Sequence, residues 1–386
     1  MEELQLLKVG DPREVGMNPS RLGLIDKAVK EGIKQGTFPG AVVLIMKSGI
    51  IVKHRSYGLA MAVPTRRKMF PSTIFDLASL TKVVVTVPLA LILVELGVWT
   101  LKDPIGRFIS ELKGEWARKI TIWHLLTHTS GFPPWAALYS QGRGKEEILE
   151  LICTNKWPLV SPVCGPGERV IYSDLGYILC GAAIEKATGS RLDSLAAELI
   201  FDPLGMRDTL FNPPKDLRDR IAATEDDPRR GGVLVGIVHD ENAWAMGGVS
   251  GHAGLFSTAL DLAIYAQMLL NHGHYGSKMV LSPNSVRLMT SLQTEGMNER
   301  RGLGWLIQGK SAVSAGDLLS DKAFGHTGFT GTSLWIDPED ELVIILLTNR
   351  VHPSRKHSVG DIQRLRALVN NLAAGAIEKK QQGKGS

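Results

Sequence analysis

Cysteine is scarce in this chain: its 386 residues include only Cys153, Cys164 and Cys180. Three is an odd number, and the spacing lacks the close pairs that are typical of a structural zinc site. A disulfide scaffold and a cysteine-based metal centre are therefore excluded. We expect three reduced thiols that belong mostly to the core.

Long hydrophobic runs are missing as well. The longest, Val83–Val94, is shorter than the roughly 20 residues of a membrane span, and Thr86 and Pro88 interrupt it. Met1–Asn18 contains acidic residues and no apolar stretch of the kind that drives secretion. The sequence therefore predicts a cytoplasmic protein without a membrane span, although a chain trimmed of an export signal would look the same.

Charge of one sign is not in strong excess. Lys and Arg number 44 against 39 Asp and Glu, which gives a net charge of +5. No basic cluster is interleaved with aromatic residues, so a nucleic-acid partner is not expected. The small positive excess permits only a slight preference for anionic substrates, and the sequence does not indicate an oligomeric state.

Strand patterns lie at both ends of the chain, and helix patterns lie between them. Ala41–Met46 and Ile50–Tyr57, joined by Lys47–Gly49, predict a β-hairpin. Four later segments are strand-like: 233–238, 302–307, 331–336 and 342–348. Residues suited to cap a helix precede several helical patterns, namely Asn18, Thr121, Ser173, and Thr258 with Asp261.

This order predicts an α/β fold of the α+β type. The N-terminal hairpin would join the C-terminal strands in one antiparallel sheet flanked by helices, with an all-helical lobe inserted. The expected lobes are 1–75 with 225–377 for the sheet and 76–224 for the helices, and the polar tail 378–386 is expected to be disordered. Clefts between lobes are where sites usually lie.

Ser79 and Lys82 lie three residues apart at the start of the apolar run. If a helix begins there, both side chains share one face. A serine hydroxyl needs a base to become a nucleophile, and a lysine serves as one only if burial or a helix N-terminus lowers its pKa from about 10.4. Alone the pattern is weak, because a helix cap followed by a surface lysine gives the same letters.

Two further segments combine glycine turns with reactive side chains. Tyr172-Ser173-Asp174 follows the turn Gly165–Gly167, and Gly325–Gly331 contains His326-Thr327-Gly328 before a strand. Glycines there allow another backbone or a substrate to come close. A strained turn and a β-bulge are the alternative interpretations.

Other catalytic motifs fail on single residues. Ser250 follows Gly248, but His252 stands where a nucleophile elbow needs its second glycine. His124 and His128 have the spacing of a zinc helix, but Leu125 replaces the metalloprotease glutamate. We expect structural roles for both histidines, and neither a metal nor a cofactor.

The three remaining motifs together resemble one family. Ser79-x-x-Lys82, Tyr172-x-Asp174 and His326-Thr327-Gly328 occur in the order found in the penicillin-recognising serine hydrolases. The chain is most similar to the class C β-lactamase-like branch, which includes family VIII carboxylesterases, D-aminopeptidases and muropeptide or D-Ala-D-Ala hydrolases. Four segments support the resemblance, which covers about residues 10–375: 75–82, 124–131, 202–206 and 247–251.

The resemblance implies roles for these residues. Ser79 would attack an acyl carbon and form an acyl-enzyme, with Lys82 as its base or proton relay. Tyr172 would help to remove the proton and later activate water. The backbone amides of Ser79 and Phe329 would form the oxyanion hole, and His326 and Thr327 beside Gly328 would contact the carboxylate or carbonyl side of the substrate.

Two residues depart from the family pattern. Asp174 stands where asparagine is usual, and an ionised carboxylate cannot donate a hydrogen bond to a substrate amide. It could instead hold Lys82 protonated. His326 replaces the usual lysine, so the permanent cation for a β-lactam carboxylate is missing. Both changes disfavour efficient β-lactam hydrolysis.

His239 and Asp240 belong to a segment that resembles amidase-like members of the family, some of which act on muropeptides. Two interpretations stay open: these residues contact the substrate, or they brace a loop at the rim of the cleft.

The function that the sequence favours is a carboxylesterase acting on small acyl esters. A peptidase or amidase on D-amino-acid or muropeptide substrates, with weak β-lactamase activity, is the alternative enzyme. A penicillin-binding receptor without turnover is the alternative of another class. In each case the expected partner is a small acyl compound.

Overall fold

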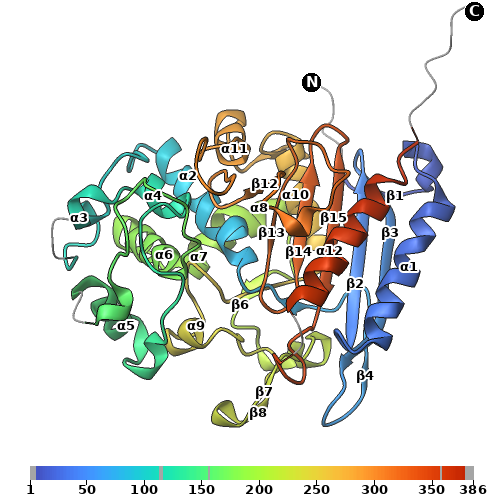
Figure 1. Cartoon of the computed structure of the whole chain (residues 1–386), viewed down its shortest axis with the longest axis horizontal. Coiled ribbons are helices and arrows are strands. Elements are labelled where there is room, and N and C mark those ends of the chain that lie inside the picture. Colours follow the sequence, from blue (N-terminus) through green and yellow to red (C-terminus); the bar gives the residue numbers. More distant parts are fainter. Residues whose placement is uncertain (1–5, 113–115, 155–156, 357–358, 379–386) are drawn as a thin grey trace, which may run out of the picture.

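The computed structural model describes residues 6–112, 116–154, 157–356 and 359–378. Most of the tail that was expected to be disordered lies outside these ranges. Its first residue, Glu378, is described, and its N–H donates to the carbonyl of Gly16 at 2.7 Å. Figure 1 shows the sheet at one side of the molecule and most of the helices at the other.

One large sheet contains eight strands in the order β1-β3-β2-β15-β14-β13-β12, with β4 paired to β3. Its strands are β1 (Lys8–Val9), β2 (Gly40–Lys47), β3 (Ile50–Met61), β4 (Arg67–Lys68), β12 (Leu306–Ile307), β13 (Phe324–Thr327), β14 (Ser333–Asp337) and β15 (Leu342–Thr348). All pairs are antiparallel except β1 with β3.

The N-terminal hairpin and the last strand meet at the centre of this sheet. β2 pairs with β15 from Ala41 opposite Thr348 to Lys47 opposite Leu342. Both strands are almost wholly buried, so their continuous apolar runs reflect a sheet that is covered on both faces. The predicted α/β fold with an antiparallel sheet flanked by helices is confirmed.

Smaller β-structures join the rest of the chain. They are β5 (Phe75–Asp76), β9 (Leu255–Ser257) and β6 (Leu210–Phe211) in one three-stranded sheet, β7 (Asp226–Asp227) with β8 (Gly232–Val233), and β10 (His274–Tyr275) with β11 (Lys278–Met279). Because β6 lies within 76–224, that part of the chain is not purely helical. The division of the chain into two lobes stays a prediction.

The α-helices of the described residues are α1 (Pro19–Lys34), α2 (Val87–Glu95), α3 (Trp116–Lys119), α4 (Ile122–Leu126), α5 (Gly144–Thr154), α6 (Asp174–Thr188), α7 (Leu192–Ala196), α8 (Asp202–Leu204), α9 (Glu241–Ala245), α10 (Ala259–Leu270), α11 (Pro283–Thr290) and α12 (Val359–Ala374). Four of these helices, α1, α4, α6 and α10, begin at the N-caps predicted from the sequence: Asn18, Thr121, Ser173 and Thr258. In each case the side-chain oxygen of the cap accepts a hydrogen bond from a backbone N–H in the first turn.

Helices cover both faces of the large sheet. α1 and α12 pack together over one face, where alternate residues such as Val43 and Ile45 join their apolar side chains (Figure 1). The other face, with Val42 and Leu44, continues into a larger core that includes α2, α6 and α10. Among the described residues, no helix is both long and apolar enough to cross a membrane; the cytoplasmic location stays a prediction.

Two predicted strands are mostly wrong. In 233–238 only Val233 belongs to a strand, because the two-residue β7–β8 hairpin is followed by a turn at Gly236, whose φ is +70°. In 302–307 only Leu306 and Ile307 are paired, because Gly304 adopts a φ of +79°. An added Cβ at Gly304 would come within 2.8 Å of the Tyr177 hydroxyl, so the strand breaks where the backbone crosses the helical core.

Candidate active site

Ser79 lies in a turn between β5 and the helical segment that follows. Ala78, directly before it, has a φ of +47°, a costly conformation for a residue with a side chain. The buried carboxylate of Asp76 accepts hydrogen bonds from the N–H groups of Ala78 (2.8 Å) and His239 (2.6 Å). Asp76 therefore stabilises the strained turn that presents Ser79.

The helix after Ser79 begins with a π-helical turn, η2 (Lys82–Thr86), before it continues as α2. Pro88 has no N–H and its ring clashes with the carbonyl four residues earlier in a regular α-helix. The wider turn avoids this clash, and the N–H of Val87 donates to the carbonyl of Lys82. Lys82 thus lies on a π-turn, a feature frequent at functional sites.

Lys82 is fully buried and contacts Ser79. Its Nζ donates to Ser79 Oγ at 3.0 Å and to the carbonyl of His252 at 3.1 Å, and it forms an ion pair with Asp174 at 2.7 Å. Burial disfavours the ammonium, but the charge of Asp174, together with hydrogen bonds to Asp174 and Tyr172, outweighs burial and raises the Lys82 pKa. This direction favours the interpretation in which Asp174 holds Lys82 protonated, and the role of Lys82 as base or proton relay stays a prediction.

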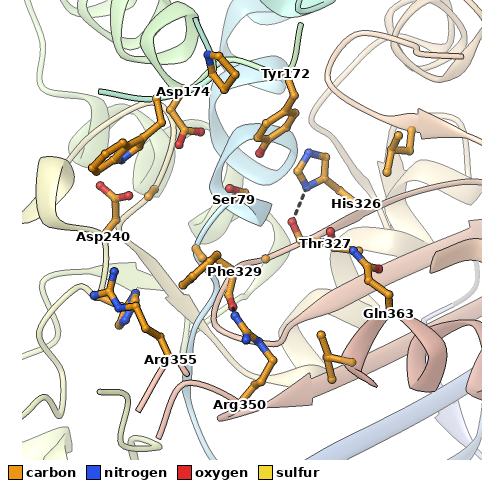
Figure 2. Close-up of a pocket in the computed structure, with 18 of the residues that line it drawn as sticks. Ser79, Tyr172, Asp174, Asp240, His326, Thr327, Phe329, Arg350, Arg355 and Gln363 are labelled. Carbon is orange, nitrogen blue, oxygen red and sulfur yellow. Dashed lines mark hydrogen bonds between the residues drawn. The ribbon is translucent and has the colours of Figure 1, made fainter. Parts of the chain in front are cut away.

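Tyr172 lies in the loop just before α6. Figure 2 shows its oxygen directed toward Ser79, and Lys82 Nζ lies 4.8 Å from the centre of its ring. The ring packs beside His128, whose Nδ1 accepts from the N–H of Ser173 at 3.0 Å. His128 thus positions the tyrosine loop. The Nδ1 of His124 accepts separately from the N–H of Thr121 at 3.0 Å.

His326 and Thr327 end strand β13 on the far side of Ser79 from Asp174 (Figure 2). The Nδ1–H of His326 donates to the carbonyl of Thr327 at 2.9 Å, which leaves Nε2 as an acceptor with no partner among the described residues. Burial, with the nearby cations Arg301 and Lys82, lowers the His326 pKa well below its usual value. The ring is therefore a neutral acceptor and not a cation.

The loop after β13 lies against the Ser79 turn. A Cβ on Gly328 would come within 2.4 Å of the Leu77 carbonyl, so only glycine permits this approach. Arg366 donates to the carbonyls of Gly328 and Thr332 at 2.8 Å, and Arg350 donates to that of Phe329 at 2.6 Å. The amides of Ser79 and Phe329 have no acceptor among the described residues.

His239 and Asp240 take different positions. His239 braces the rim: its N–H binds Asp76, its Nε2 lies 3.1 Å from Glu225, and its ring stacks on Phe329 at 5.7 Å. Asp240 caps α9 and also accepts from His252 Nε2 at 2.8 Å. Burial would raise the Asp240 pKa, but the charge and hydrogen bond of His252 outweigh burial and lower it.

These groups line one cavity of about 520 Å³. All ten predicted site residues except Lys82, which lies beneath Ser79, contribute to its wall: Ser79, Tyr172, Asp174, His239, Asp240, His326, Thr327, Gly328 and Phe329. Sequence reasoning missed the four arginines that also line it, Arg301, Arg350, Arg355 and Arg366, and the exposed ring of Trp135. No local pattern identifies them, because tertiary packing alone brings them together.

Arg301 changes the charge expected of this cavity. Its guanidinium lies 5.2 Å from the Tyr172 ring, and it donates to Glu299 (2.9 Å) and to the carbonyl of Gly304 (3.1 Å). A permanent cation therefore lines the cavity, and the expectation that a β-lactam carboxylate lacks one because His326 replaces lysine stays a prediction.

Asp174, Asp240 and His252 could in principle hold a cation, since one ligand atom from each lies within 4.8 Å of the others. The ammonium of Lys82 already lies 2.7 Å from Asp174, and the Nε2 proton of His252 is donated to Asp240. The residues present therefore fit a divalent ion poorly, because it would face the lysine charge at close range.

Comparison with known proteins identifies relatives over most of the chain. A family model described as Beta-lactamase matches residues 25–368. A protein of Escherichia coli O157:H7 named "Putative D-alanyl-D-alanine carboxypeptidase" is 36% identical over 388 residues, covering 90% of this chain and 86% of that protein. A protein of the same name from Salmonella enteritidis PT4 is 34% identical and covers 91% and 87%.

Solved structures agree on the fold. An octameric penicillin-binding protein homologue from Pyrococcus abyssi is 25% identical with a TM-score of 0.72, covering 93% of this chain and 78% of that one. A class C beta-lactamase is 18% identical with a TM-score of 0.73, covering 94% and 98%. EstCE1, described as a hydrolase with promiscuous acyltransferase activity, is 22% identical with a TM-score of 0.70, covering 90% and 99%. The chain therefore belongs to the beta-lactamase family and is a serine hydrolase of the β-lactamase and penicillin-binding-protein type.

Proposed function

We propose that this enzyme is a serine peptidase that forms an acyl-enzyme through Ser79 and cleaves D-alanyl-D-alanine-type peptides. The observation that carries the acyl-enzyme is the hydrogen bond from Lys82 Nζ to Ser79 Oγ at 3.0 Å, inside a cavity that is large enough for a small peptide. The names of the curated relatives support the peptide substrate.

The raised pKa of Lys82 decides which group accepts the proton of Ser79. An ammonium cannot accept a proton, so the Ser79 proton passes to the Tyr172 oxygen while the tyrosine gives its own proton to the leaving nitrogen. The Ser79 Oγ–carbon bond forms, the carbon–nitrogen bond breaks and the amine leaves neutral. Lys82 remains an ammonium and stabilises negative charge that develops on both oxygens.

Deacylation reverses these roles. Water attacks the acyl carbon, and Tyr172 takes the water proton while it gives its own proton to Ser79 Oγ, which leaves as the acyl–oxygen bond breaks. In both steps the amides of Ser79 and Phe329 would donate to the carbonyl oxygen. Two convergent N–H donors of this kind contribute about 3–4 kcal/mol each to such transition states.

Arg301 favours a peptide over an ester. Its guanidinium lines the cavity beside Tyr172 and His326, where it can bind the terminal carboxylate of a leaving D-alanine. A carboxylesterase stays the second candidate: Asp174 replaces an amide donor for peptide substrates, and the exposed Phe329 offers an apolar wall. A receptor without turnover is the third.

A substrate panel tests the choice. We expect turnover of D-alanyl-D-alanine peptides that Arg301→Gln reduces about 100-fold in kcat/KM, as for a lost charged contact, while p-nitrophenyl acetate changes little. Arg300→Gln is the matched control, because Arg300 does not line this cavity. Ester turnover with no peptide turnover would establish the esterase, and acylation without a steady rate would establish the receptor.

A further inference from the structure

The amide of Phe329 belongs to a peptide unit whose carbonyl end is bound by a buried arginine. A peptide bond is planar and trans, so the carbonyl of Gly328 and the N–H of Phe329 point in opposite directions. Arg366 Nη2 donates to that carbonyl at 2.8 Å and to the carbonyl of Thr332 at 2.8 Å. The N–H of Phe329 therefore points away from Arg366, and it has no acceptor among the described residues.

Arg366, on α12, is a cation without a carboxylate partner. It is 3% exposed, and no described residue forms an ion pair with it. Its buried Nε also lacks an acceptor within the described part of the chain. Burial, with the charge of Arg350, lowers the Arg366 pKa to about 9, so the guanidinium stays charged at neutral pH. A buried charge of this kind costs folding free energy, and negative charge that develops nearby offsets that cost.

The two amides of the expected oxyanion hole differ in what binds the carbonyl of their peptide unit. Both carbonyls close a turn, since Gly328 accepts from the N–H of Gly331 at 3.1 Å and Ala78 from that of Thr81 at 3.0 Å. The second donor to Ala78 is the neutral hydroxyl of Thr81 at 2.6 Å. The second donor to Gly328 is the charged Arg366. Because the turn already orients the Gly328 peptide, the arginine adds charge.

Arg350 acts on a different peptide unit. It donates to the carbonyl of Phe329 at 2.6 Å, and that carbonyl shares its peptide bond with the N–H of Thr330. In Figure 2, Arg350 lies on the side of Phe329 that faces away from Ser79. Arg366 is therefore the arginine that is bound to the same peptide unit as the Phe329 N–H.

We propose that Arg366 strengthens the oxyanion hole by polarising the Gly328–Phe329 peptide. A cation at the carbonyl end draws electron density toward the oxygen, so the N–H at the other end becomes a stronger donor. As Ser79 Oγ bonds to the acyl carbon, the acyl oxygen gains negative charge, which the polarised N–H stabilises more than it stabilises the unreacted carbonyl. Arg366 acts through the peptide, so it is a positioning residue. The inference rests on the proposed acyl-enzyme and holds for peptides and esters alike.

Ester acylation separates this role from direct binding of a substrate carboxylate, because p-nitrophenyl acetate has none. We expect Arg366→Gln to lower its acylation rate constant about 10-fold or more, below the roughly 100- to 1000-fold cost of losing a whole oxyanion donor. The KM of the ester should change little, and D-alanyl-D-alanine peptides should lose kcat by the same factor. The amplitude of the acylation burst counts the folded active sites, so unfolded protein does not distort the rate.

Two variants complete the set. Arg366→Lys keeps the charge and should recover part of the rate. Arg364→Gln removes an exposed arginine of the same helix and should match the wild type. Difference infrared spectroscopy with an isotope-labelled acetyl group then reports on the acyl-enzyme itself. Hydrogen bonds lower the stretching frequency of the acyl carbonyl, so this frequency should rise in Arg366→Gln and return toward the wild-type value in Arg366→Lys.

An unchanged carbonyl frequency in Arg366→Gln, or an unchanged acylation rate, would overturn the proposal. A loss confined to the D-alanyl-D-alanine peptide would assign Arg366 to the substrate carboxylate instead. The two proposals fail separately. A wild-type enzyme that forms no acyl-enzyme with either substrate contradicts the proposed function, whereas normal acylation in both the wild type and Arg366→Gln contradicts only the role of Arg366.

Discussion

At the scale of single residues, Asp174 stands where asparagine is usual in the second motif. Its carboxylate decides the direction in which the Lys82 pKa moves. A buried lysine would normally lose its proton, yet the neighbouring carboxylate reverses that tendency. In the proposed mechanism Lys82 is therefore a fixed ammonium beside Ser79, and Tyr172 transfers the proton.

Replacing Asp174 by asparagine should move the pH profile of acylation. The carboxylate raises the Lys82 pKa, so its loss lowers that pKa. In the proposed mechanism the protonated lysine is the active form, so kcat/KM falls as pH rises through this pKa. We expect the basic limb of the profile to shift to lower pH in Asp174→Asn and to stay in place in Glu241→Gln. A basic limb that does not move would mean that Lys82 does not act as a cation.

Asp76 should matter for stability and for rate together. Asp76→Ala would leave the buried N–H groups of Ala78 and His239 without an acceptor, at about 1–3 kcal/mol each. We expect urea unfolding to show a loss in that range and acylation of Ser79 to slow, because the strained turn at Ala78 relaxes. Asp76→Asn retains one acceptor oxygen and should be intermediate; a stable variant with unchanged acylation would contradict the assigned role.

The sequence predicts the reactive residues better than their surroundings. Ser79, Lys82, Tyr172 and His326 belong to motifs with fixed spacing, so they can be recognised without coordinates. Arg301 and Arg366 lie in unremarkable segments, and only packing brings their guanidinium groups to the cavity. The direction of the Lys82 pKa has the same cause, since it depends on a carboxylate ninety-two residues away in the chain.

At the scale of elements, the backbone positions the site through close approaches and local caps. The N-caps at Asn18, Thr121, Ser173 and Thr258 are predictable because each depends on one side chain and the turn after it. The strand breaks at Gly236 and Gly304 are not predictable in this way, because they depend on contacts with elements that are distant in the sequence. The π-turn after Ser79 follows from Pro88, but only the folded chain reveals that the helix widens instead of kinking.

Gly328→Ala should damage the site through the backbone. The new Cβ would lie 2.1 Å from Thr332 Oγ1 and 2.4 Å from the Leu77 carbonyl oxygen, so the loop that carries the Phe329 amide must move away from Ser79. We expect a loss of about 1–3 kcal/mol in unfolding free energy and slower acylation. Gly23→Ala is the control: nothing lies within 4 Å of its Cβ in α1, and it should stabilise the protein by about 0.5–1 kcal/mol. Equal effects of the two changes would contradict the account.

At the scale of the whole molecule, a network of charges joins segments that are distant in sequence. Glu225 binds His239 at 3.1 Å and Arg355, and Arg355 also binds Glu241. Burial would raise the Glu225 pKa, but its hydrogen bonds to His239 and Arg355 outweigh burial and lower it well below its usual value. The network therefore ties the rim of the cavity to the segment after β15.

This network should make the enzyme sensitive to acid. A carboxyl group whose pKa is lowered by folding contributes stability above its unfolded pKa of about 4.3, and that contribution is lost as pH falls. We expect the unfolding free energy from urea titrations to decrease below about pH 5, and Glu225→Gln to flatten this dependence. A variant with the same slope as the wild type would show that the acid response arises elsewhere.

The central claim is that Ser79 carries the acyl group. The most direct test incubates the enzyme with a D-alanyl-D-alanine peptide or with p-nitrophenyl acetate, quenches in acid and measures intact mass followed by peptide mapping. The account predicts one added acyl group on the peptide that contains Ser79, a much slower appearance in Tyr172→Phe, and none in Ser79→Ala. An adduct that forms equally in Ser79→Ala, or that maps to another residue, would contradict it.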